Sequence, residues 1–119
     1  MKIVLAIDDN LMQLDMYAKM LSGKYEVKTA GSASEALNVL KTSRADVILL
    51  DIEMPDVSGF DLYNDIRKIP DCAGTPIIIV SGNSDPEFLE KAGKTGAFCV
   101  MIKPVKLGAL AETIGKALV

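Results

Sequence analysis

Hydrophobic and polar residues follow two alternating patterns along the chain. Short apolar runs are typical of strands, whereas segments in which apolar residues recur every three or four positions are typical of amphipathic helices. The first pattern predicts strands at 2–7, 25–29, 46–50, 76–80 and 97–102, and the second predicts helices at 11–21, 32–41, 58–69, from about 84, and 106–118. Each predicted strand is therefore followed by a predicted helix.

Residues with capping or helix-breaking preferences support several of these boundaries. Ser32 and Glu35 have the spacing of a capping box. Ser84 stands where an N-cap is expected, with Pro86 in the first turn that follows. Pro70 would end the third helix. The apolar faces predicted for the first and last helices consist of Leu11, Leu14, Ala18 and Leu21, and of Leu107, Leu110, Ala111, Ile114 and Leu118.

The composition of the strands predicts their places in a sheet. Four of them are almost continuously apolar, which is expected of parallel strands buried on both faces, whereas the strand at 25–29 alternates as an edge strand does. Strands that alternate with helices imply a parallel sheet covered by helices on both faces, which is an α/β fold. We expect one domain over residues 1–119, without an output domain.

Composition narrows the class of protein. The chain has 119 residues, a formal net charge of −3 and no histidine. This charge argues against a nucleic-acid-binding surface, and the lack of histidine argues against Ser-His-Asp hydrolases and most zinc enzymes. No apolar run is long enough to span a membrane, and the two cysteines, Cys72 and Cys99, match no metal-ligand spacing. We expect a cytoplasmic protein that binds neither nucleic acid nor membrane.

Polar residues follow four of the predicted strands. Asp8 and Asp9 come after the first strand, Asp51 after the third, Ser81 after the fourth and Lys103 after the fifth. The carboxyl ends of parallel strands share one edge, where ligands bind. Neighbouring carboxylates repel one another unless a cation joins them, and Mg²⁺ takes such oxygen ligands beside phosphate oxygens. An aspartate can then be the nucleophile that forms an aspartyl-phosphate. The pattern indicates Mg²⁺-dependent phosphoryl transfer.

Four motifs stand at these strand ends in order. They are IDDN at 7–10, LLDIEMPDVSG at 49–59, VSGN at 80–83 and GAFCVMIKP at 96–104. Through them the chain resembles the receiver domain of bacterial two-component response regulators, over essentially its whole length. The resemblance implies a flavodoxin-like, CheY-like (βα)5 fold, a doubly wound sheet of five parallel strands in the order 2-1-3-4-5. It implies a signalling domain and not an enzyme, with only self-phosphorylation and autodephosphorylation as its own chemistry.

The resemblance also implies the roles of the acidic residues. Asp51 would be the phosphoacceptor. Asp9 would ligate Mg²⁺ directly and Asp8 through water, and Asp51 and the backbone carbonyl of Glu53 would complete the protein's share of the ligands. Residues that shape the loop after the phosphoacceptor, without chemistry of their own, would be Met54, Pro55 and Gly59.

The remaining implied roles concern the phosphoryl group and the signal. Lys103 would bind the phosphoryl group across a cis peptide bond to Pro104, and Ser81 would carry the hydroxyl that moves toward the phosphate on activation. The donor would be a sensor histidine kinase or a histidine phosphotransfer protein. A downstream effector protein or a fused output domain would read the surface formed by the fourth helix, the fifth strand and the fifth helix.

One position departs from the family. Val100 stands three residues before Lys103, where the family usually has a tyrosine or phenylalanine that rotates on activation. Valine has no ring to move, and its side-chain torsion is stiff. We therefore expect a weaker response in the last helix than in relatives that carry the aromatic residue.

Three other functions fit parts of the sequence. AGKTGA at 92–97 resembles the end of a P-loop, but Phe88 replaces the first glycine and the segment follows a helix. Asp51 and Glu53 have the acid-x-acid spacing of haloacid-dehalogenase-like phosphatases, which carry it after the first strand and not the third. A receiver that docks partners without phosphorylation is a third alternative, against which the complete set of site residues argues.

Overall fold

The computed structural model describes residues 1–54 and 57–119, so the expectation that Pro55 shapes a loop lies outside the described residues. Within these ranges the core is a sheet of five parallel strands in the order β2-β1-β3-β4-β5, which confirms the predicted order. The strands are β1 (Ile3–Ile7), β2 (Glu26–Ala30), β3 (Val47–Asp51), β4 (Ile77–Ser81) and β5 (Cys99–Ile102).

Each strand is followed by a helix, as predicted. The helices are α1 (Leu11–Leu21), α2 (Ala33–Thr42), α3 (Gly59–Arg67), α4 (Pro86–Gly93) and α5 (Leu107–Ala117), with a short 3-10 turn at Pro70–Cys72 after α3. In residues 1–54 and 57–119, no helix has the length and apolar character needed to cross a bilayer.

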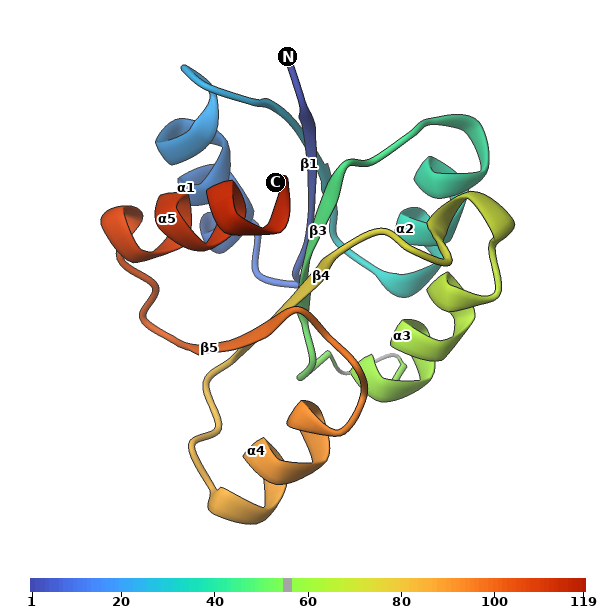
Figure 1. Ribbon diagram of the computed structural model, residues 1–119, viewed down its shortest axis with the longest axis vertical. Coiled ribbons are helices and arrows are strands. Elements are labelled where there is room, and N and C mark those ends of the chain that lie inside the picture. Colours follow the sequence, from blue (N-terminus) through green and yellow to red (C-terminus); the bar gives the residue numbers. More distant parts are fainter. Residues whose placement is uncertain (55–56) are drawn as a thin grey trace.

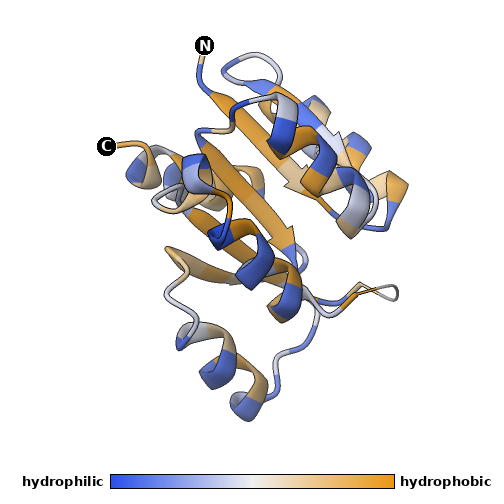
Figure 2. Cartoon of the chain, turned by 90° about the vertical axis from the view of Figure 1, so that its right-hand side faces the viewer, coloured by the Kyte–Doolittle hydropathy of each residue, from blue (hydrophilic) through white to orange (hydrophobic). Residues whose placement is uncertain are grey.

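The helices cover both faces of the sheet (Figure 1). On one face, Val4 of β1 lies in a buried cluster with Leu14 of α1 and Ile114 of α5. On the other face, Leu5 of β1 lies in a second cluster with Leu62 of α3, and α2 and α4 add to it. Successive residues of a strand point to opposite faces, so the central strands must be apolar at every position. Figure 2 shows these apolar strands between helices whose outer faces are hydrophilic.

Polar side chains cap the first four helices, α1 to α4, where they begin at the carboxyl ends of the strands. The Asn10 carboxamide oxygen accepts two backbone N–H bonds in the first turn of α1. Ser32 caps α2 as predicted, its hydroxyl accepting the N–H three residues further on. The prediction that Ser84 caps α4 is wrong, because Asp85 accepts the N–H of Glu87 at 2.9 Å. The helix begins at Pro86, so the residue next to it is the one that reaches the free N–H groups of the first turn.

The fifth strand is less buried than its apolar sequence predicts. β5 forms the edge of the sheet opposite β2, and its residues are half-buried or exposed. Ile102 is 40% exposed and Phe98, just before the strand, is 47% exposed. The expectation that this strand is buried on both faces is therefore wrong, because β5 has a neighbouring strand on one side only.

Two predicted helix faces are incorrect at their first residue. Leu11 opens α1 and is 74% exposed, and Leu107 opens α5 and is also exposed. The Leu11 side chain lies beside the loop that follows β2, where a Cβ on Gly31 would be 3.9 Å from it. Tyr17, one turn and a half further on, lies over the sheet and is buried. The buried face of each helix therefore begins one turn further on, at Leu14 in α1 and at Leu110 in α5.

Gly59 brings the start of α3 against the backbone that follows β3. Its N–H donates to the Ile52 carbonyl at 3.2 Å, and a Cβ at this position would lie 2.3 Å from Ile52 Cα. Contacts this short with a backbone atom cannot be relieved by rotating a side chain. The glycine is therefore required for the close approach of two backbone segments next to Asp51.

Gly59→Ala should destabilise the protein, because the added methyl group forces these backbone segments apart. We expect a loss of about 1–3 kcal/mol, the usual cost of overpacking. Gly115→Ala is the control, since it lies inside α5 with no atom within 4 Å of the added Cβ, and it should stabilise by about 0.5–1 kcal/mol. Urea unfolding measures both changes. Equal midpoints for Gly59→Ala and the unsubstituted protein would contradict the packing described here.

Candidate functional site

The predicted site residues lie together at the carboxyl edge of the sheet. Asp51 and Ser81 are the last residues of the neighbouring strands β3 and β4. Asp8 follows β1, on the other side of β3, and its N–H donates to the Ala30 carbonyl at 3.1 Å. Lys103 follows β5, and its N–H donates to the Ser81 carbonyl at 2.7 Å. Backbone hydrogen bonds of the sheet therefore hold the residues from which these side chains extend.

Three aspartates form a compact acidic cluster. One carboxylate oxygen from each of Asp8, Asp9 and Asp51 lies within 4.8 Å of the other two. Asp8 and Asp51 are buried, with exposed fractions of 0% and 4%, whereas Asp9 is exposed. Carboxylates this close repel one another, and a hard divalent cation between them would relieve the repulsion. The residues present therefore fit an Mg²⁺ ion.

Lys103 joins the two buried aspartates. Its Nζ donates to Asp8 Oδ2 at 2.9 Å and to Asp51 Oδ2 at 3.3 Å. Burial lowers the pKa of Lys103, but the hydrogen bonds and charges of the two aspartates outweigh that effect, so its pKa is above the ordinary value. The bond from Lys103 to Pro104 is cis, as predicted.

The electrostatics of Asp51 reflect competing influences. Its Oδ1 accepts the Glu53 N–H at 3.0 Å. The pKa of Asp51 is raised from 3.8 to about 6, because burial and, to a lesser extent, the Asp8 charge raise it by more than the Glu53 N–H and Lys103 lower it. The ionised form of this carboxylate is therefore poorly stabilised in the metal-free protein, which favours the binding of a cation beside it.

Ser81 is buried, and its hydroxyl is occupied by a residue for which sequence analysis predicted a different role. The Ser81 hydroxyl donates to Glu53 Oε1 at 3.0 Å, and the Gly82 N–H donates to the same oxygen at 2.8 Å. The resemblance assigned the Glu53 backbone carbonyl to the metal ligands and did not predict this contact of the Glu53 carboxylate with Ser81. No local pattern in the sequence marks this carboxylate, because its partners lie 28 and 29 residues further along the chain.

The site combines carboxylate ligands for a hard cation with two hydrogen-bond donors. The Lys103 ammonium donates to Asp8 and Asp51, and the Ser81 hydroxyl donates to Glu53. These groups can hold a phosphoryl group against an aspartate and offset its charge. A surface hollow of about 550 Å³ lies at the other end of the strands, near the amino ends of β3 and β4, and none of these side chains lines it. It is lined by residues 40–45, before β3, and by Asp71 and Cys72, before β4.

Comparisons with known proteins agree with this geometry. Residues 4–115 match the family described as the response regulator receiver domain. A probable cyclic di-GMP phosphodiesterase from Vibrio cholerae is 32% identical over 111 residues, which is 93% of this chain. The chain spans only 25% of the length of that relative.

Solved structures are similar over the whole chain. The chemotaxis protein CheY4 of Vibrio cholerae has a TM-score of 0.92 and 32% sequence identity, with 99% of each chain covered. The response regulator protein TrrA of Thermotoga maritima, in complex with Mg(2+)-BeF, has a TM-score of 0.87 and 28% identity, with 99% of this chain and 100% of that chain covered.

These findings leave the haloacid-dehalogenase and P-loop alternatives without support, since the acid-x-acid pair begins at the last residue of β3, the third strand, and the matched family is a signalling one. The fold, the match over residues 4–115 and the similarity to CheY4 together establish that this chain belongs to the response regulator receiver domain family of two-component systems.

Proposed function

We propose that Asp51 is the phosphoacceptor of this receiver, and that it takes its phosphoryl group from the phosphohistidine of a sensor histidine kinase or a histidine phosphotransfer protein. The observation that carries this proposal is the contact of the Lys103 ammonium with both Asp8 and Asp51 in a buried site. Such a cation next to the nucleophile offsets the charge of an incoming phosphoryl group.

In the proposed reaction, a carboxylate oxygen of Asp51 attacks phosphorus. A P–O bond forms, the P–N bond to the donor's imidazole breaks, and the imidazole nitrogen takes up a proton. The donor imidazole must come from another protein or domain, because this chain contains no histidine. Lys103 holds a phosphoryl oxygen, and the buried backbone around Asp51 keeps the nucleophile in place.

Asp8, Asp9 and Asp51, with the backbone carbonyl of Glu53, would hold Mg²⁺. Bound there, the cation would supply positive charge to the transferred phosphoryl oxygens. The close spacing of the three carboxylates supports this assignment, and the TrrA structure shows that a related receiver forms a complex with Mg(2+)-BeF.

The phosphorylated domain would signal through a downstream effector protein or a fused output domain, in the cytoplasm. The surface formed by α4, β5 and α5 would be the one recognised. Residues 1–119 would act as a single receiver domain, without enzymatic activity beyond self-phosphorylation and autodephosphorylation.

Treatment with acetyl phosphate and Mg²⁺ should add one phosphoryl group to the protein, and Asp51→Asn should abolish the addition because the nucleophilic oxygen is lost. Intact-mass spectrometry measures both. Asp15→Asn is the control, since Asp15 is exposed on α1 and paired with Lys19. Unchanged incorporation in Asp51→Asn would remove the assignment, and no incorporation in any protein would favour a receiver that docks partners without phosphorylation.

Metal-free Asp51→Asn should be more stable than the unsubstituted protein above pH 6. The Asp51 pKa is about 6 in the folded protein and near 3.8 in the unfolded protein. Below about pH 4 the Asp51 carboxyl is protonated in both states, and its full contribution to the stability of the fold is present. That contribution is lost as pH rises through 6, because the carboxyl ionises less readily in the folded protein than in the unfolded one. The difference should be roughly 1–3 kcal/mol at pH 7.5, because each tenfold change in proton affinity corresponds to about 1.4 kcal/mol, and it should be near zero at pH 4.

Urea unfolding in EDTA at these two pH values measures the difference, with Asp15→Asn as the control. Millimolar Mg²⁺ should stabilise the unsubstituted protein, because the ion binds the folded state, and should stabilise Asp51→Asn less. An unfolding midpoint that is indifferent to Mg²⁺ would argue against the metal site.

Val100 packs, half-buried, against the cluster formed by α2, α3 and α4. We expect beryllofluoride with Mg²⁺ to change amide NMR shifts strongly around Ser81 and weakly along α5, because valine has no ring to move between two positions. Val100→Tyr should increase the shifts along α5. Changes along α5 that already match those around Ser81 in the unsubstituted protein would show that Val100 does not weaken the response.

A further inference from the structure

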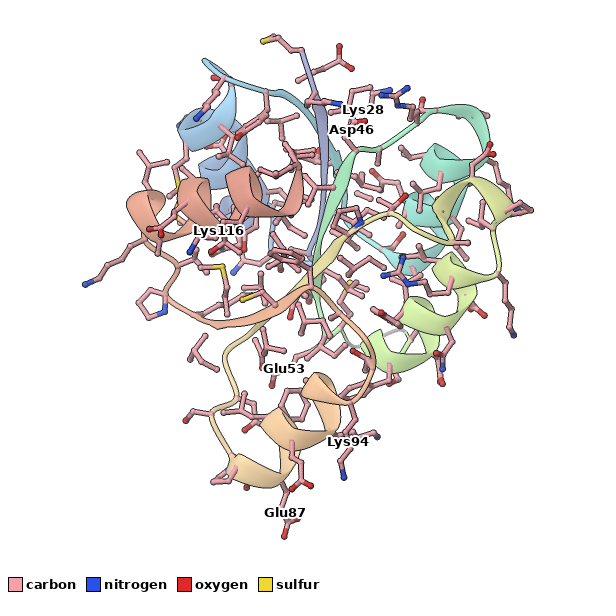
Figure 3. The ribbon with its side chains drawn as sticks, viewed as in Figure 1. Lys28, Asp46, Glu53, Glu87, Lys94 and Lys116 are labelled. Atoms are coloured by element: carbon pink, nitrogen blue, oxygen red, sulfur yellow. The ribbon has the colours of Figure 1, made fainter. Side chains whose placement is uncertain are left out.

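Glu53 connects the ends of two neighbouring strands. Its backbone N–H donates to Asp51 Oδ1 at 3.0 Å, at the end of β3. Its carboxylate extends to the loop after β4, where Oε1 accepts the Ser81 hydroxyl at 3.0 Å and the Gly82 N–H at 2.8 Å. Figure 3 shows Glu53 between the end of the sheet and α4. One residue therefore contacts both the nucleophile and the hydroxyl of the site.

The Ser81 hydroxyl has one proton to donate. Among the described residues, two acceptors lie within reach, Glu53 Oε1 at 3.0 Å and the Asn83 carbonyl at 3.3 Å. The carboxylate is nearer and charged, so it forms the stronger bond. Because Ser81 is completely buried, its hydroxyl must leave Glu53 before it can donate to another group.

A phosphoryl group on Asp51 would need these same donors. Asp51 and Ser81 end adjacent strands, and Asp51 pairs in register with Val80. The phosphoryl oxygens are anionic acceptors, and the Ser81 hydroxyl and Gly82 N–H are donors at the end of the neighbouring strand. The Glu53 carboxylate already occupies both donors. Two anions cannot share them without repulsion.

We infer that the Glu53 carboxylate is an internal latch, which holds the Ser81 hydroxyl and the Gly82 N–H in the unphosphorylated protein and is displaced when Asp51 carries a phosphoryl group. This inference rests on the proposed phosphorylation of Asp51. Glu53 is thus a positioning residue that acts through Ser81. Breaking the hydrogen bonds of the Glu53 carboxylate to Ser81 and Gly82 contributes to the free-energy difference between the unphosphorylated state and the activated state.

Beryllofluoride with saturating Mg²⁺ is the probe, because it mimics an aspartyl-phosphate without a donor protein. Glu53→Gln keeps the length of the side chain but removes its charge, and Glu53→Ala removes the acceptor entirely. Both should bind beryllofluoride more tightly than the unsubstituted protein, by about threefold to tenfold, the range expected for loss of a hydrogen-bonded competitor. The gain should be larger for Glu53→Ala, and it should shrink at 1 M salt.

NMR titration of nitrogen-15-labelled protein measures these affinities and adds a direct signature. The Gly82 amide proton donates to a carboxylate in the resting protein, so its resonance should move upfield in Glu53→Gln before any ligand is added. A purely structural role for Glu53 would lower the urea unfolding midpoint without tightening the binding of beryllofluoride.

Two further variants serve as controls. Glu87→Gln removes the same charge from an exposed residue of α4, and Figure 3 shows Glu87 directed away from the sheet. It should leave the affinity unchanged. In a Ser81→Ala background, Glu53→Gln should produce a smaller gain, because the hydroxyl that the latch holds is absent.

The outcomes separate the two proposals. Binding by the unsubstituted protein without a gain in Glu53→Gln would overturn the latch and leave the phosphoacceptor intact. Weaker binding of both beryllofluoride and Mg²⁺ in Glu53→Gln would also overturn it, and would assign the carboxylate to the metal site. Failure of the unsubstituted protein to bind beryllofluoride would overturn both proposals.

Discussion

The site depends on the burial of two carboxylates, Asp8 and Asp51, at the edge of the sheet. Removing a carboxylate from water is costly unless a cation or hydrogen-bond donors replace the lost hydration. Here the Lys103 ammonium contacts both acids, and backbone N–H groups of Asn10 and Glu53 donate to them. Even so, the pKa of Asp51 is raised to about 6. The site therefore retains unfavourable negative charge that a divalent cation would relieve.

The parallel sheet explains how residues far apart in the sequence come together to stabilise the two buried carboxylates. Asp8, Asp51, Ser81 and Lys103 come from four strands, and hydrogen bonds between strands hold the backbone of each. Apolar residues on both faces of the central strands keep the sheet rigid and exclude water from beneath the acids. The polar edge is thus supported by the same apolar runs that identified the strands.

Most of the fold and the membership of the site followed from the sequence, because both depend on local patterns and on the common edge of parallel strands. The errors arose where tertiary position decides the outcome. β5 is apolar yet half-buried because it lies at an edge of the sheet, and Leu11 is exposed because the buried face of α1 begins only at Leu14. Asp85 replaces Ser84 as the cap of α4. The contact of the Glu53 carboxylate with Ser81 depends on how two loops approach each other, which no periodicity encodes.

Three donors of the site, on Lys103, Ser81 and Gly82, are engaged by the protein's own acids in the unphosphorylated state. Lys103 donates to Asp8 and Asp51, whereas the Ser81 hydroxyl and the Gly82 N–H donate to Glu53. A phosphoryl group would exchange one set of anionic acceptors for another and would leave few donors unpaired. Because hydrogen bonds broken and formed in such an exchange nearly cancel, the free-energy difference between the two states can be small. A small difference is what allows one phosphoryl group to shift the population between them.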